Sequence, residues 1–200
     1  MNTLIRSGAF AIALLSLAGA TSVGAAASTD PMKASGPSTI SNDDIGFFGK
    51  AAQTGMTEVQ AATIASTRAS GADTKSFAST MATDHTANNE ELKALALRKG
   101  VTLPTQLDKT HQGMLDELQK EDPRTFDAAY AKDMTAGHKG AISLFEKTSK
   151  DSKDPDIRDF AKSTLPTLRH HLKMAKHLSE KSQVATEAAT AGQTPQQPLP

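Results

Sequence analysis

Three of the six histidines stand at positions where a helix would bury its apolar side. They are His85, His138 and His171, and each is spaced three or four residues from apolar neighbours. A buried imidazole needs partners for its ring nitrogens, so histidine is uncommon in such a stripe. Three occurrences in one short chain suggest a shared cause. One such cause is a metal ion, which neutral imidazole binds through a ring nitrogen.

A carboxylate on a fourth stripe could complete the set. Glu58 and His85 lie about equally far from a turn near Gly71, so at about 1.5 Å of rise per residue they should be level in an antiparallel hairpin. His138 and His171 are offset by roughly one helical turn about a second turn, near residue 152. All four side chains are therefore expected near the middle of the helices.

These residues support two interpretations, and spacing alone does not choose between them. Glu58, His85, His138 and His171 could bind one zinc, copper or iron ion, with Asp84 as a further ligand or as an acid that orients a ligand. Alternatively, the same residues could form a hydrogen-bonded polar layer that fixes the register of the helices and binds nothing.

Apolar periodicity places these side chains on helices. Long helices are expected over Asp43–Ser70, from Asp73 as N-cap to Lys99, over Pro123–Lys150 with Pro123 in the first turn, and over Pro155–Lys181, with a kink at Pro166. A short amphipathic helix is expected over Asp108–Glu121. Together they predict an all-α fold, an antiparallel up-down four-helix bundle with a short crossover helix between the second and third long helices.

The two ends of the chain differ from this middle part. Arg6, an apolar run over 9–20 and small residues up to Ala27 predict a signal peptide over residues 1–27, because the run is shorter than the roughly 20 residues needed to span a bilayer. Residues 28–41 and 182–200 have the composition of disordered segments, which leaves 42–181 as the bundle domain. The mature protein is expected to be periplasmic or secreted, without a transmembrane segment.

Composition excludes several functions. Lysine plus arginine equals aspartate plus glutamate at 22 each, and aromatic residues make up 4%, which does not favour nucleic-acid binding. The chain has no cysteine, so thiolate metal sites and disulfides are excluded. Neither a nucleophile elbow nor a phosphate-binding glycine loop is present, so an enzyme of the hydrolase or kinase class is not favoured.

Several motifs in this order resemble an exported, ferritin-like family, domain-of-unknown-function family 4142, often described as predicted outer membrane proteins. The matching stretches are Phe48 to Ala52 with Glu58-Val59, Phe77-Ala78 with Met81 and Asp84-His85, Leu103-Pro104, Phe126-Asp127 with Tyr130, Met134 with His138, and Leu165-Pro166 with His171-Leu172. They cover about Asp43 to Leu178.

The resemblance implies a ferritin-like bundle in the cell envelope, with outer-membrane association as a further expectation, and implies little about activity. It also implies that Glu58, Asp84-His85, His138 and His171 stand at recurring positions, which favours a functional layer. Gly137 stands where the family commonly has an acid before the second histidine. The Glu-x-x-His pairs of di-iron bundles are missing, so ferroxidase chemistry is not expected.

The sequence therefore predicts an exported bundle of unknown activity that binds one transition-metal ion, and more weakly an oxidoreductase that uses it. The alternative is a metal-free envelope stress or interaction module with a cell-envelope partner, in which the polar layer is structural.

Overall fold

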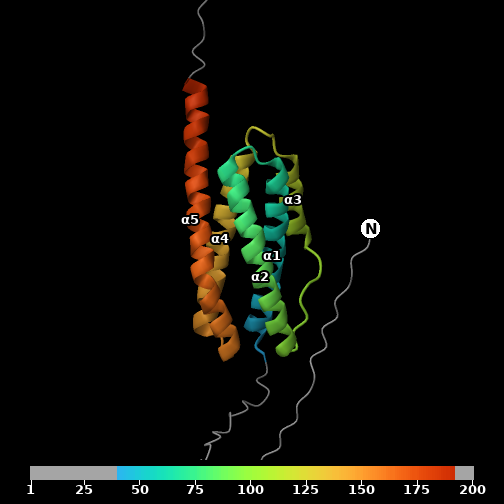
Figure 1. Cartoon of the computed structure of the whole chain (residues 1–200). Helices are drawn as coiled ribbons and strands as arrows, with labels where there is room; N and C mark the ends of the chain where they lie inside the picture. The colour runs from blue at the N-terminus through green and yellow to red at the C-terminus, as the bar shows by residue number, and fades with distance from the viewer. Residues whose placement is uncertain (1–39, 192–200) are drawn as a thin grey trace, which may run out of the picture. The chain divides into compact units, whose positions relative to one another are not determined.

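The computed structural model describes residues 40–191, which form five α-helices and no strand (Figure 1). The helices are α1 (Asn42–Arg68), α2 (Ala72–Arg98), α3 (Lys109–Lys120), α4 (Phe126–Asp151) and α5 (Pro155–Ala191). The prediction of an all-helical fold is confirmed. Among the described residues, none of the helices is both long enough and apolar enough to cross a membrane. The predicted signal peptide, the segment up to residue 39 and residues 192–200 lie outside the described residues.

Side-chain caps explain where most helices begin. The Ser41 hydroxyl accepts the N–H of Asp44 at 3.1 Å at the start of α1, and the Asp108 carboxylate accepts the N–H of His111 at 2.9 Å at the start of α3. Asp154 does the same for α5, accepting the N–H of Ile157 at 3.2 Å. After α2, Gly100 adopts a φ of 68°, the left-handed conformation that favours glycine at the residue closing a helix.

Two predicted helix starts are wrong. The cap of α2 is Gly71 rather than Asp73, because the carboxylate of Asp127 in α4 accepts the N–H groups of Ser70 and Gly71 at 3.0 and 2.7 Å and replaces a local cap. Asp73 lies in the first turn and pairs with a lysine of α5 instead. The start of α4 is Phe126 rather than Pro123, because residues 122–125 form a separate turn. At the other end of the chain, α5 runs through Pro166 and continues to Ala191, past the expected end.

The four long helices contact one another in a ring: α1 packs on α2 and α4, and α5 packs on α4 and α2. Their directions follow from contacts at the helix ends. Lys99 at the end of α2 pairs with Asp154 before α5 at 2.7 Å, and Asp127 in the first turn of α4 binds Gly71 before α2. α2 and α4 therefore run in the same direction, and α1 and α5 run opposite to them.

The up-down order holds within each of the two hairpins, and the connection through α3 joins the hairpins so that α2 and α4 run in the same direction. α3 lies alongside α1, where Gln53 donates to the carbonyl of Gln106 at 3.0 Å and Arg68 donates to the carbonyl of Glu121 (Figure 1). The loop before α3 and α3 itself carry the chain back along α1 before α4 begins. The 12 residues of α3 supply about 18 Å of that return at 1.5 Å per residue.

The core of this helix ring is divided into two apolar clusters. One contains Phe77, Phe126 and Tyr130, and the other contains Phe48 and Phe145. On each of the four long helices, one buried ionisable residue lies between the parts that belong to the two clusters. This polar layer consists of Glu58, His85, His138 and His171.

Candidate metal centre

The polar layer is almost completely buried. The exposed fraction is 3% for Glu58 and His85 and 0% for His138 and His171. One Glu58 oxygen lies 3.0 Å from His85 Nδ1 and the other lies 3.4 Å from His138 Nδ1. The predicted level placement of Glu58 and His85 is thus observed, and the helices bring together all four side chains that the sequence singled out.

A backbone hydrogen bond fixes the orientation of the His138 ring. Its Nδ1 lies 2.8 Å from the carbonyl oxygen of Met134, which can only accept, so Nδ1 carries a proton. This proton is not directed at Glu58, and the 3.4 Å approach of the two side chains is an electrostatic contact only. In the neutral ring, Nε2 then has a free lone pair. This nitrogen is buried and has no hydrogen-bond partner among the described residues.

Carboxylates fix the other two rings. His171 Nε2 lies 2.8 Å from Asp84 Oδ2, and His85 Nδ1 lies 3.0 Å from Glu58 Oε2. If both rings are neutral, these nitrogens are the donors, so His171 Nδ1 and His85 Nε2 have lone pairs. The two nitrogens face each other at 3.3 Å. Two lone pairs at this distance repel each other unless a proton or a cation lies between them.

Each of the three histidines offers one ring nitrogen, and these three atoms lie within 4.8 Å of one another. Two imidazole nitrogens on a tetrahedral zinc ion at 2.0–2.1 Å would be about 3.4 Å apart. The 3.3 Å between His85 and His171 matches this value. We call His85, His138 and His171 the histidine triad.

The electrostatics of the layer favour a cation. Burial raises the pKa of Glu58, but the three histidines, His85 foremost, outweigh burial and hold this pKa below its usual value. Burial also lowers the pKa of His138 and His171, which keeps these imidazoles neutral near pH 7. These two neutral rings provide no counter-charge for the buried Glu58 carboxylate. A divalent ion at the triad would supply one.

The sequence suggests that Glu58 is a metal ligand, but the two carboxylates of the site contact the histidines from outside the triad. Glu58 contacts the outer nitrogens of His85 and His138, on the side away from the triad's lone pairs, and Asp84 contacts the outer nitrogen of His171. Both occupy the place of acids that orient metal-binding histidines. A Cβ at Gly137 would lie 3.6 Å from Glu58 Oε1, an ordinary van der Waals distance, so an alanine would also fit beside the carboxylate.

The sequence did not identify two polar residues near the layer, Tyr130 and Thr164. The hydroxyl of Tyr130 is buried without a partner, and burial, with a smaller contribution from Glu58, raises its pKa. The hydroxyl of Thr164 donates to Asn88 at 3.1 Å beside the triad. Tyr130 stands at an ordinary position of an apolar stripe, so its type and spacing do not mark it. The contact between Thr164 and Asn88 joins helices that are distant in sequence, so no local pattern predicts it.

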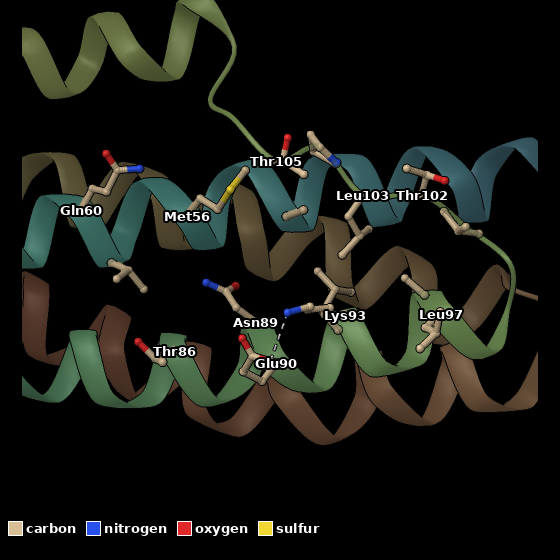
Figure 2. Close-up of a pocket in the computed structure, with 16 residues that line it drawn as sticks. Met56, Gln60, Thr86, Asn89, Glu90, Lys93, Leu97, Thr102, Leu103 and Thr105 are labelled. Carbon is tan, nitrogen blue, oxygen red and sulfur yellow. Dashed lines mark ion pairs between the residues drawn. The ribbon is translucent and has the colours of Figure 1, made fainter.

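A separate groove of about 740 Å³ lies between α1, α2 and the loop after α2 and is not lined by the polar layer (Figure 2). Asn89 projects from α2 toward α1 in this groove (Figure 2), and a Cβ at Gly55 would lie 1.9 Å from its side-chain oxygen. Gly55 therefore allows Asn89 to approach α1, which explains a glycine at a stripe position.

Fold and site together define an all-helical protein whose core contains a buried histidine triad with an outer shell of carboxylates. Over residues 29–178 the chain matches the family described as "Domain of unknown function (DUF4142)", and it belongs to this family. The crystal structure of a DUF305 fragment from Deinococcus radiodurans is similar in fold, with a TM-score of 0.64 over 72% of this chain and 99% of that chain, at 13% identity. At this identity the likeness concerns the fold alone. No curated protein matches the chain.

Proposed function

We propose that this protein is an exported, periplasmic, ferritin-like four-helix bundle that binds one transition-metal ion through His85, His138 and His171. Glu58 and Asp84 act as acceptors that orient the ligands. The three-imidazole donor set suits zinc, copper or iron. Export rests on the signal-peptide pattern of residues 1–27, and outer-membrane association remains an expectation from the family resemblance.

The proposal rests on the different contacts that the two nitrogens of each ring make. In each histidine of the triad, one nitrogen contacts an acceptor outside the triad; the other nitrogens of His85 and His171 face each other, and the His138 ring packs against both rings. A purely structural layer gains by pairing every buried nitrogen. Here His138 Nε2 has no partner although it is fully buried, which a bound metal ion would explain.

The alternative is a metal-free envelope module in which the layer fixes helix register and an exposed surface binds a partner. The contact between His171 and His85 supports this alternative, because one shared proton would turn it into a hydrogen bond. It leaves His138 Nε2 unexplained. We assign no catalytic step to the triad.

Elemental analysis of the mature protein, purified from periplasm without a histidine tag, tests the proposal. His171→Ala should abolish near-stoichiometric metal, whereas His170→Ala, which removes the exposed neighbouring imidazole, should retain it. Absence of metal in the wild-type protein, even after incubation with zinc, copper and iron salts, would favour the alternative. Equal loss in both variants would point to adventitious surface binding.

A further inference from the structure

The buried layer is reached from the surface on two sides. A pocket of about 360 Å³ between α2 and α5 reaches His85 and His171, and we call it the α2–α5 pocket. A wider pocket of about 920 Å³ reaches Glu58 from the opposite pair of helices, and we call it the α1–α4 pocket. Of these two pockets in the described part of the chain, the α2–α5 pocket is lined by members of the histidine triad and the α1–α4 pocket is not.

The two pockets differ in charge. Apart from histidine, the charged residues that line the α2–α5 pocket are Asp84 and Glu91, and neither lysine nor arginine lines it. The α1–α4 pocket carries both signs, with Lys50 and Lys147 beside its acids. A narrow cleft of one sign concentrates ions of the opposite sign and increases their rate of association. Cations should therefore be attracted to the α2–α5 pocket.

One carboxylate in this pocket connects solvent to the buried site. The side chain of Asp84 is 40% exposed, yet its Oδ2 lies 2.8 Å from Nε2 of His171, whose side chain is fully buried. Glu91 is exposed on the same helix, two turns further along. Beyond His85 and His171 lies the unpartnered nitrogen of His138. Oxygen donors near the surface are thus followed by nitrogen donors inside.

We propose that the α2–α5 pocket is the route by which a hydrated divalent cation enters and leaves the histidine triad. Glu91 attracts the cation, and Asp84 is its first protein contact before the imidazoles replace its water. This inference rests on the proposed metal binding at the triad. It adds that loading is directional and takes place on one side of the protein.

Paired tryptophan substitutions at the two openings test the route. Thr167 lines the α2–α5 pocket, Ala136 lines the α1–α4 pocket, and both are exposed. Uptake of Co²⁺ by the mature, metal-free chain is followed by stopped-flow absorbance, and its release is followed with a chelator. Thr167→Trp should slow uptake and release by the same factor, about tenfold or more, because a blocked route raises one barrier for both directions. Ala136→Trp should change neither rate.

The attraction of cations is tested by removing one charge at two neighbouring positions. Glu91→Gln should reduce the association rate about two- to tenfold at low ionic strength, and the difference should vanish near 1 M salt. Glu90→Gln is the matched control, since Glu90 is also exposed but lines the groove of Figure 2 rather than the α2–α5 pocket. It should leave the rate nearly unchanged.

Each outcome separates the route from the metal site itself. Suppose that the wild-type protein takes up Co²⁺. If Ala136→Trp then slows uptake as much as Thr167→Trp, or if neither variant slows uptake, the route is refuted and the metal site stands. Absence of Co²⁺, Zn²⁺ and Cu²⁺ binding by the wild-type protein would refute both proposals. Circular dichroism checks that the variants fold, and Ser163→Trp, in the same pocket, serves if Thr167→Trp does not.

Discussion

Glu58→Gln should weaken metal binding without removing a metal ligand. The glutamine oxygen can still accept the proton of His85 Nδ1, which lies 3.0 Å from Glu58 Oε2, but it carries no charge to offset the cation or to increase the basicity of the imidazole. Replacing such an outer partner typically costs about 10- to 100-fold in metal affinity.

The expected size can be stated as a stabilisation. A ligand at 100 times its dissociation constant stabilises the folded state by about 2.7 kcal/mol. At the same free zinc concentration, a variant with 10- to 100-fold weaker affinity would be stabilised by only about 1.4 to 0.4 kcal/mol. Urea denaturation of the wild-type protein and Glu58→Gln, with and without buffered zinc, measures this difference. Equal stabilisation of both proteins would refute an orienting role for Glu58.

Three further predictions concern the helix ring and the layer. Asp154→Asn should lose about 1 to 3 kcal/mol in urea denaturation at pH 7, because it removes the charge that pairs with Lys99, although asparagine can still cap α5. Burial opposes ionisation of Asp154, but Lys99 and the capped N–H groups outweigh burial and lower its pKa. The stabilisation by the ionised Asp154 is therefore fully present above the unfolded-state pKa of about 3.9, and it should vanish as the pH falls through the lower pKa of the folded state. Asp127→Ala should lose about 1 to 2 kcal/mol in the same assay, since Asp127 caps α2 at Gly71 from another helix, whereas Lys132→Ala on the exposed side of α4 should lose less than about 0.5 kcal/mol. His138→Leu should abolish metal binding in elemental analysis yet leave metal-free stability unchanged or about 1 kcal/mol higher, because it removes an unpaired buried nitrogen; a loss above 1 kcal/mol would favour a structural layer.

Local pattern was sufficient to predict the helices and the level of the layer. Apolar spacing and a short-range signal such as the closing glycine, Gly100, act within a turn or two of the chain, so they can be predicted from neighbouring residues. Glu58 and His85 could be placed opposite each other because the turn between α1 and α2 is short. The direction of α4 could not be predicted, because the connection through α3 is long enough to return the chain to either end.

Features that depend on distant parts of the chain were not predictable. The cap of α2 comes from Asp127, which lies 56 residues from Gly71 in sequence, so the local candidate Asp73 was preferred. The role of Glu58 depends on which ring nitrogen it contacts. Spacing places a carboxylate near an imidazole, but only atomic positions show that it lies on the outer side.

The unpaired ring nitrogen of His138 is the feature that bears most directly on whether the layer has a function. A fully buried imidazole nitrogen without a partner costs about 1 to 3 kcal/mol relative to a paired one, a large part of the stability of a typical small domain. A leucine would fill a similar volume, and the carbonyl of Met134 would keep its place in the helix. If register alone were needed, Glu58 with His85 would provide a polar contact between α1 and α2 at lower cost. The unpaired nitrogen is therefore best explained as a ligand atom of the proposed metal site.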